Sequence, residues 1–321
     1  MRAFARLLAV LGAVAASLAC AQPYPNRPVK VIVPWPPGQA TDVAARTVAE
    51  KLSVALGQQF VIDNRAGAGG TIGTELAARS VPDGYTILAG SSGPISISPH
   101  VGKVGYDPDR DFEPICLLAS SPYVLVTHPS FPAATVPEFI ALLRANPGKY
   151  TFASSGTGAT SHLVAELFNA SAKVSATHIP YKGSAPALTD IIAGHVTYTI
   201  ETTASVLAHV KAGRLKALGV SSATRALAFP ELPTLAEAAN LPGFDVRAWI
   251  GYLAPAGMPR EARMRLAAES QKILDTGEMK ERLLSLGLEP PNLSPEEFGA
   301  FIKQQNERFG AIARQANIRV Q

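Results

Sequence analysis

The sequence predicts an α/β protein of two domains joined by a hinge of two crossing segments. Strand-like and helix-like patterns alternate almost throughout the chain, which is typical of α/β proteins with mostly parallel sheets. The length of 321 residues and the hydrophobic content of 47% suit about two domains. Two glycine-rich turns, roughly 120 residues apart, also lead from an expected strand into an expected helix.

The first part of the chain has the pattern of a β-α-β-α-β unit. Apolar residues of its first helix recur at helical spacing, from Ala45 to Ala55. The turn at 82–84 introduces the last strand of the unit. In order, we expect a strand at 29–33, a helix from Asp42 to about Leu56, a strand at 60–63, a helix at 71–79 and a strand at 85–89.

A second run repeats this pattern. A strand at 123–126 leads to a helix that Thr135 caps, with Glu138 three residues later. The strand at 150–153 then enters the second glycine-rich turn, which opens a helix through Leu163 and Phe168. Further strands are expected near 176–179, 196–200 and 215–220, and helices near 185–193 and 204–211.

The C-terminal part contains helices without a sheet of their own. A strand at 245–253 carries the chain onward, and helices follow at about 260–275 and 295–316. Packing them on the first domain makes the second domain an insertion, and the two crossings form the hinge. The expected capping pairs are Thr234 with Glu237 and Ser294 with Glu297. The expected domains are residues 22–122 plus 246–321, and residues 123–245.

Residues 1–21 have the order of a secretory signal peptide. Arg2 and Arg6 precede an apolar stretch and a small-residue triplet that ends at Ala21, where cleavage is expected. The stretch is shorter than the roughly 20 residues that span a bilayer. Lipid attachment at Cys20 is disfavoured, because Ser17 lies where a large aliphatic residue is usual. We therefore expect a periplasmic protein.

Composition excludes several function classes. The formal net charge of +4 falls to near +2 without the signal peptide, and no basic run is present, so nucleic acid is not an expected partner. The mature chain keeps only Cys116, which lies in an apolar run and is expected to be buried, so no internal disulfide forms.

The two glycine-rich turns are the candidate binding site. The first runs from Pro34 to Asp42 and the second from Ser154 to His162. Each leaves backbone N–H groups and hydroxyls at the positive end of a helix, where an anion can be held without a lysine. Two such helix ends that face each other would form a carboxylate clamp.

Three side chains of these turns, those of Asp42, Trp35 and His162, have two interpretations each. Thr41 is a plausible N-cap, and Asp42 either favours the helix start or binds an ammonium group or a bridging water. Trp35 either stacks on a ligand or packs in the domain interface. His162 either donates a hydrogen bond to a ligand or caps its helix.

Nucleotide binding and catalysis are both disfavoured. The glycine cluster at 67–73 has Ile72 at the last glycine position of the dinucleotide motif and is better explained as a further set of backbone donors. Ser91 lies in a degenerate nucleophile elbow, but residues 94–99 lack the pattern of the required helix. The six histidines show no metal-binding spacing, so no cofactor is expected, and a serine hydrolase is an unlikely alternative.

These motifs resemble, in their order, the Bug-type periplasmic solute receptors of tripartite tricarboxylate transporters. The resemblance runs over nearly the whole mature chain. The matching segments are 24–28, 33–42, 64–70, 82–85, 106–108, 111–112, 154–163, 181–183, 233–237 and 254–257.

The resemblance implies a Venus flytrap that closes on a small carboxylated metabolite and presents it to a membrane permease. The ligand would be a dicarboxylate, an amino acid or an aromatic acid, and a ligand sensor of a signalling system is the alternative. By position, the implied ligand-binding residues are Trp35, Pro36, Gly38, Gln39, Ala40, Thr41, Asp42, Ser91, Ser155, Gly156, Thr157, Gly158, Ala159, Thr160, Ser161, His162, Tyr181 and Glu201.

Three of these residues depart from the family pattern. Trp35 replaces the usual phenylalanine, Gln39 a frequent glycine and Glu201 a common aspartate. A wider aromatic wall and an added amide would favour an aromatic carboxylate.

Overall fold

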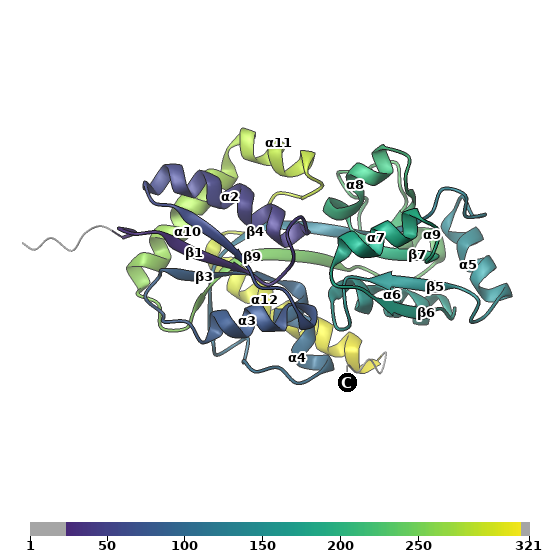
Figure 1. The fold of residues 1–321 in the computed structure, drawn as a ribbon, viewed down its shortest axis with the longest axis horizontal. Helices are drawn as coiled ribbons and strands as arrows, with labels where there is room; N and C mark the ends of the chain where they lie inside the picture. The colour runs from purple at the N-terminus through teal and green to yellow at the C-terminus, as the bar shows by residue number, and fades with distance from the viewer. Residues whose placement is uncertain (1–23, 316–321) are drawn as a thin grey trace, which may run out of the picture.

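A nine-stranded sheet extends through both lobes of the computed structural model, which describes residues 24–315 (Figure 1). The predicted signal peptide and Cys20 lie outside the described residues. The strand order is β2-β1-β3-β9-β4-β7-β5-β6, and β8 pairs with β4. The strands are β1 (Val29–Val33), β2 (Phe60–Asn64), β3 (Thr86–Ser91), β4 (Phe112–Thr127), β5 (Thr151–Ser154), β6 (Thr177–Pro180), β7 (Tyr198–Thr202), β8 (Lys216–Val220) and β9 (Arg247–Pro255).

Helices cover the sheet in each lobe (Figure 1). The first lobe carries α2 (Ala40–Leu56), the turn η1 (Ala68–Gly70), α3 (Thr71–Ala78), the turn η2 (Gly93–Ile97), α4 (Ser98–Val101), α10 (Arg260–Asp275), α11 (Gly277–Ser285) and α12 (Pro295–Gln315). The second lobe carries α5 (Val136–Ala145), α6 (Thr160–Ala172), α7 (Ser184–Ile192), α8 (Thr203–Lys211) and α9 (Leu235–Ala239).

The expectation of mostly parallel sheets is wrong. Parallel pairing is confined to β1 with β2 and β3, and to β5 with β6 and β7. The strands β4 and β9 run antiparallel to each other and to all their other partners. The chain leaves the first lobe along β4 and returns along β9, so these two central strands point in opposite directions.

Strand β4 is longer than the sequence predicted. It begins at Phe112 rather than at Tyr123 and includes the apolar run around Cys116, which is buried as expected. Residues up to Pro122 pair with β9 in the first lobe, and residues from Tyr123 pair with β7 in the second. The partners of β4 thus change at the predicted domain boundary, although the domain division itself stays a prediction.

The C-terminal helices pack on the first lobe, as predicted. Leu266 and Leu274 of α10 join the core that α2 and β9 form, and Phe298 of α12 packs against Trp249 with ring centroids 5.7 Å apart. The far end of α12 also joins the core of the second lobe through Phe309. These helices therefore belong mainly, but not solely, to the first lobe.

The predicted caps at Thr135, Thr234 and Ser294 are confirmed, but the cap expected at the first glycine-rich turn is not, and helices α4 and α11 were not predicted. Thr135 accepts a hydrogen bond from the backbone N–H of Glu138, and a full capping box joins Thr234 and Glu237. Helix α2, however, begins at Ala40 with Gln39 as its N-cap residue, so Thr41 is not the cap. The side chain of Thr41 is instead buried in the first turn of the helix.

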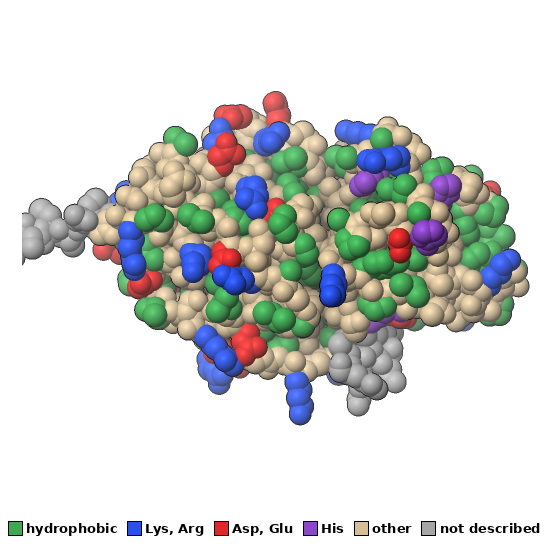
Figure 2. Space-filling view, viewed as in Figure 1, with side chains coloured by type: hydrophobic (Ala, Val, Ile, Leu, Met, Phe, Trp, Pro, Cys, Tyr) green, Lys and Arg blue, Asp and Glu red, His purple; other side chains and the backbone are tan. Residues whose placement is uncertain are grey.

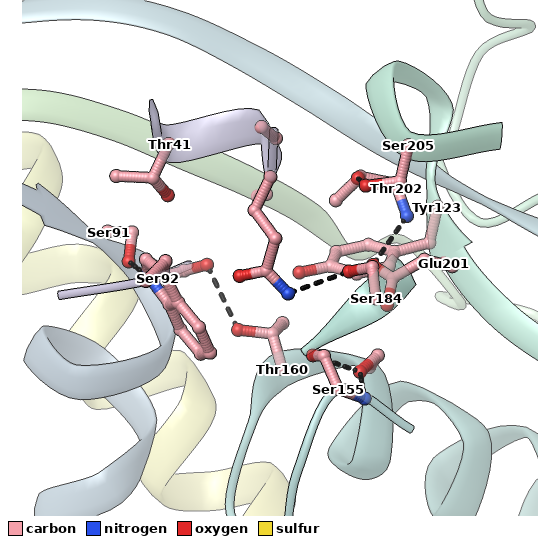
Figure 3. A pocket seen from close by; sticks show the side chains of 15 residues that line it. Thr41, Ser91, Ser92, Tyr123, Ser155, Thr160, Ser184, Glu201, Thr202 and Ser205 are labelled. Atoms are coloured by element: carbon pink, nitrogen blue, oxygen red, sulfur yellow. Dashed lines mark hydrogen bonds between the residues drawn. The ribbon is translucent and has the colours of Figure 1, made fainter. Parts of the chain in front are cut away.

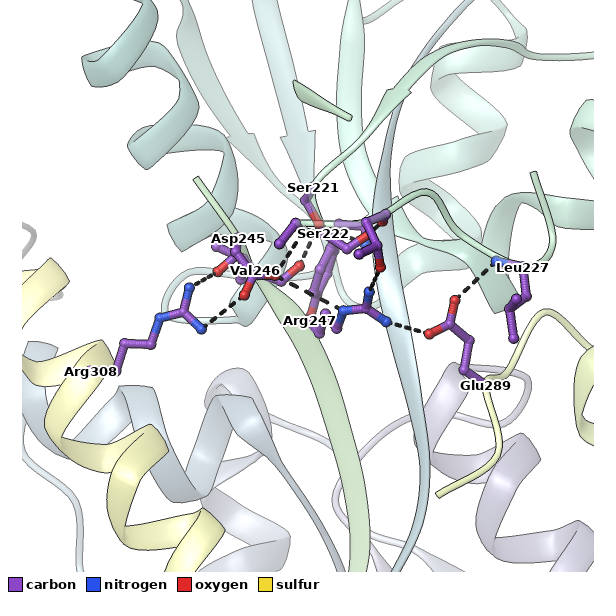
Figure 4. A network of polar contacts seen from close by, with 11 residues as sticks. Ser221, Ser222, Leu227, Asp245, Val246, Arg247, Glu289 and Arg308 are labelled. Atoms are coloured by element: carbon purple, nitrogen blue, oxygen red, sulfur yellow. Dashed lines mark hydrogen bonds and ion pairs between the residues drawn. The ribbon is translucent and has the colours of Figure 1, made fainter. Parts of the chain in front are cut away.

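A polar network joins the two lobes near the start of β9 (Figure 4). The carboxylate of Glu289 accepts hydrogen bonds from Arg247 and, at 3.1 Å, from the backbone N–H of Leu227. Arg308 of α12 donates to the backbone carbonyl and, at 3.3 Å, to the carboxylate of Asp245. These contacts tie residues of the second lobe to α12 and to the segment after α11.

The outer surface carries mixed charge. On the face in Figure 2, Lys and Arg side chains are spread among acidic and neutral ones and form no continuous basic patch. None of the helices within residues 24–315 combines the length and hydropathy that a membrane crossing requires.

Candidate functional site

A small cavity lies between the lobes, where several helices begin (Figure 3). Its volume is about 40 Å³, which is room for roughly three waters. Hydrogen bonds between Gln39 and Ser184 and between Ser92 and Thr160 join the lobes beside it, so the lobes are closed. The lining residues are Trp35, Gln39, Ala40, Thr41, Ser91, Ser92, Tyr123, Ser155, Thr160, Ser161, Ser184, Glu201, Thr202, Ser205 and Ala248.

Four helix N-termini contribute to this lining. Thr41 belongs to the first turn of α2 and Ser161 to that of α6, while Ser184 is the first residue of α7 and Thr202 precedes α8. The N-terminus of each helix carries a partial positive charge on its free N–H groups. One helix comes from the first lobe and three come from the second, so closure brings them together.

Hydroxyl groups supply most of the polar side chains in the cavity. None of the described lining residues is Lys, Arg or His, and the only ionisable ones are Tyr123 and Glu201. Hydroxyls and backbone N–H groups can donate to an anion without bringing a charge. The arrangement therefore fits a small anion that is held by hydrogen bonds alone.

Trp35 both packs and forms a wall of the cavity. Its indole Nε1 donates to Ser91 Oγ at 2.9 Å. A Cβ atom at Gly70 would lie 3.3 Å from the indole ring, so the absence of a side chain there lets the ring settle against the backbone. The two interpretations of Trp35 are thus compatible, and its orientation is fixed by Ser91.

Gln39 connects the two lobes. Its side-chain Nε2 donates to Ser184 Oγ of the second lobe at 2.7 Å. Beside it, the hydroxyls of Ser92 and Thr160 lie 3.3 Å apart across the same interface. Gln39 therefore lines the cavity and contributes directly to its closure.

Asp42 does not line the cavity. Its carboxylate accepts hydrogen bonds from Gly38 N at 3.0 Å, Asn64 Nδ2 at 2.9 Å and Arg46 at 2.7 Å. Burial opposes ionisation, but these hydrogen bonds outweigh it and hold the pKa of Asp42 below its ordinary value. The carboxylate stabilises the first glycine-rich turn and is not free for an ammonium group.

Glu201 is the buried acid of the cavity. Its side chain is 3% exposed, Oε1 accepts from Thr202 N at 2.9 Å, and Oε2 has no hydrogen-bond partner among the described residues. Burial raises the pKa of Glu201 to about 7, against smaller opposing effects of the Thr202 amide and of the Ser184 and Ser161 hydroxyls. A carboxyl group in this state is able to donate or accept a proton near neutral pH.

The ligand-binding residues expected from the sequence fall into three groups in the structure. Those that line the cavity are Trp35, Gln39, Ala40, Thr41, Ser91, Ser155, Thr160, Ser161 and Glu201. Pro36, Gly156, Thr157 and Tyr181 line a second cavity of about 410 Å³, which shares Trp35 and Ser155 with the first and includes residues 66–70 and 180–183. Gly38, Asp42, Gly158, Ala159 and His162 line neither of these two cavities.

His162 contacts the turn before its own helix and a neighbouring histidine. Its Nδ1 accepts from Gly158 N at 3.3 Å, and its ring stacks on His178 with centroids 4.0 Å apart. His162 thus bonds to the second glycine-rich turn, just before the N-cap residue of its helix, Ala159.

Six lining residues escaped the sequence analysis: Ser92, Tyr123, Ser184, Thr202, Ser205 and Ala248. Ser184 and Thr202 stand where an expected strand passes into an expected helix, so the argument used for the two glycine-rich turns would have found them. Tyr123 and Ala248 lie on strands, and local sequence does not reveal which strand residues face a cavity.

In the described part of the chain, neither Ser91 nor Ser155, the serines that a hydrolase would use, is paired with a histidine, whereas Ser154 Oγ lies 2.7 Å from His178 Nε2. Within residues 24–315, Ser91 Oγ accepts from Trp35, and Ser155 Oγ pairs with Ser161 Oγ at 2.8 Å, so neither contacts a histidine. The expectation that no helix follows Ser91 is wrong, because η2 and α4 are helical. The part of the chain that the structure describes holds no group of three His, Cys, Asp or Glu side chains that could bind a metal.

A protein-family model and bacterial relatives match most of this chain. Residues 44–318 match the family model described as the tripartite tricarboxylate transporter family receptor. The chain is 42% identical over 286 residues to the UPF0065 protein in the tcbD-tcbE intergenic region of Pseudomonas sp. strain P51, covering 89% of this chain and 85% of the relative. It is 36% identical over 322 residues to BugT of Bordetella pertussis, covering 98% of both chains.

Solved structures share the two-lobe fold of periplasmic binding proteins. The periplasmic binding protein BugD has a TM-score of 0.87 and 36% identity, covering 93% of this chain and 100% of its own. Rpa4515 of R. palustris with adipate has a TM-score of 0.88 and 34% identity, covering 92% and 99%. MatC of Rhodopseudomonas palustris with bound malate has a TM-score of 0.83 and 31% identity, covering 90% and 99%.

Proposed function

Because the chain belongs to the tripartite tricarboxylate transporter receptor family, a family of periplasmic solute-binding proteins, we propose that it captures a small carboxylate between its lobes. After export through the N-terminal signal peptide, it delivers this ligand to the membrane permease of a tripartite transporter. Residues 22–122 plus 246–321 form one closing domain and residues 123–245 the other.

The cavity between the lobes is the observation that carries this proposal. Helix N-termini and hydroxyls surround it, and no cationic side chain of the described chain lines it. Partial positive charge at helix ends and hydrogen-bond donors together favour an anion over a cation or an apolar solute. The relatives that bind adipate and malate, both dicarboxylates, support the same ligand class for this chain.

The second cavity supports a ligand that extends beyond its carboxylate. It shares Trp35 and Ser155 with the small cavity, and most of its other lining residues are glycines, prolines and alanines, together with Thr157, Tyr181 and Lys182. An acid anchored at the helix ends would direct its remaining atoms past the Trp35 ring into this space. Since aromatic rings pack favourably against one another, an aromatic acid gains most from that wall.

A thermal-shift screen tests the ligand class. We expect benzoate-like acids to raise the melting temperature of the mature protein, because a ligand that binds the folded state stabilises it by RT ln(1 + [L]/Kd). Citrate, aspartate, malate and adipate belong in the same screen. A clear response to citrate or aspartate with none to benzoate-like acids would reject the aromatic ligand but keep the carboxylate.

A further inference from the structure

Glu201 is poorly placed to remain charged when a carboxylate occupies the cavity. It is the last residue but one of β7, its side chain is among the lining residues, and its Oε2 is buried without a partner among the described residues. A captured carboxylate would bring a second negative charge into the same closed space. Two carboxylates that share a buried site without a cation do not both ionise readily, so one of them takes up a proton.

No cationic side chain among the described residues that line the cavity offsets this repulsion. The titratable or charged side chains on the segments packed against β7 are Glu113, Cys116 and Tyr123 of β4, His162 and Glu166 of α6, Asp190 of α7, and His209 and Lys211 of α8. Of these, only Tyr123 lines the cavity, and burial together with Glu201 raises its pKa, so it stays a neutral phenol. His162 is already paired with Gly158 N and lies 3.7 Å from Glu166.

If Glu201 and the ligand were both ionised, two negative charges would compete for the N–H groups at the helix starts. Ionised Glu201 draws on the start of α8, where Thr202 N donates to its Oε1. A ligand carboxylate needs the donors at the starts of α2, α6 and α7 as well. A proton on Oε2 removes this competition and turns the acid into one more donor that points into the cavity.

We propose that Glu201 is protonated in the ligand-bound state and donates a hydrogen bond from Oε2 to the captured carboxylate. At any pH at which Glu201 is ionised before the ligand binds, capture therefore takes up one proton from water. The proposal rests on the carboxylate-binding function proposed above. No covalent bond changes: one proton moves from solvent to Glu201, and the ligand keeps its charge.

The expected linkage follows from burial of Glu201, which raises its pKa to about 7 in the closed structure. Capture should take up close to one proton at pH 8.5 and about a tenth of a proton at pH 6. If only the protonated form binds, affinity falls about tenfold for each pH unit above the pKa, which gives a loss of about 30-fold between pH 6 and pH 8.5.

Titration calorimetry of the mature protein with malate, adipate and benzoate tests this directly. Titrations at pH 6 and 8.5, each in two buffers of different ionisation enthalpy, give the proton count and the affinity together. In Glu201→Gln, the amide imitates the neutral acid, so we expect binding without proton uptake and without the pH-dependent loss. Glu166→Gln removes a carboxyl group outside the cavity and should keep the full pH dependence.

Carbon-13 NMR of the protein with labelled glutamate follows the titration of the Glu201 carboxyl without any ligand. The Glu201 signal is assigned by its loss in Glu201→Gln. A carboxyl that titrates near neutral pH supports the proposal. Binding without proton uptake at pH 8.5, or binding that Glu201→Gln abolishes as expected for an ammonium partner, overturns it. If malate, adipate and benzoate all fail to bind at any pH while Glu201 still titrates near neutral, the carboxylate function fails and the neutral Glu201 stands.

Discussion

Replacing Gly69 with leucine is expected to weaken ligand capture by about tenfold or more. In the closed structure a Cβ atom at Gly69 would lie 3.2 Å from Thr157 O and 3.3 Å from the carbonyl carbon of Gly158, both in the second lobe. A leucine side chain would occupy space that the second glycine-rich turn fills on closure. Overpacking of this kind costs about 1–3 kcal/mol, and each 1.4 kcal/mol is a factor of about ten in affinity.

Gly57→Leu is the matched control for this substitution. Gly57 has φ +66 and Gly69 has φ +65, but a Cβ atom at Gly57 would meet nothing within 4 Å. Both variants lose about 1–2 kcal/mol of stability, because a side chain disfavours the left-handed conformation. Calorimetry with the best acid of the screen then compares affinities. An equal affinity for both variants would contradict the role of this contact in closure.

Glu201→Gln is expected to raise the free energy of unfolding of the ligand-free protein by about 3 kcal/mol at pH 8. Burial raises the pKa of Glu201 from 4.5 to about 7, and each pKa unit is worth about 1.4 kcal/mol. The folded state binds this proton more tightly than the unfolded state does. The stability that Glu201 contributes is therefore present below about pH 4.5 and is lost as the pH rises through about 7.

Urea unfolding between pH 4.5 and pH 8 measures this difference. The curves of Glu201→Gln and of the unsubstituted protein should lie close together at pH 4.5 and separate as the pH rises, because glutamine does not titrate. Glu166→Gln, in which the replaced carboxyl is about one-third exposed, should not reproduce this separation. A difference that stays constant over the whole range would mean that Glu201 is ionised throughout.

The sequence predicted the local parts of the site better than the non-local ones. The two glycine-rich turns are local signals, and Thr41 and Ser161 do lie where two helices begin at the cavity. Asp42 shows the limit of that reasoning. Its carboxylate bonds to Asn64, 22 residues away on a neighbouring strand, and this partner is fixed only by the pairing of β1 with β2.

Strand direction was the main error in the predicted fold. Alternating helices and strands favour parallel pairing, but β4 and β9 are central strands that carry the chain between lobes. Their antiparallel pairing depends on the path of the chain through the whole second lobe, and no short stretch of sequence reveals that path. Tyr123 was missed for the same reason, because its place in the cavity follows from the register of β4 against β7.

The central claim is that helix ends and hydroxyls hold a carboxylate in a cavity without a cation. Calorimetry of the mature protein against malate, adipate and benzoate, each paired with its uncharged amide, tests it most directly. We expect one-to-one binding of at least one acid and an affinity at least 100-fold lower for its amide, because only the acid brings the charge that the helix ends attract. An amide that binds as tightly as its acid, or an absence of binding by all three acids, would contradict the account.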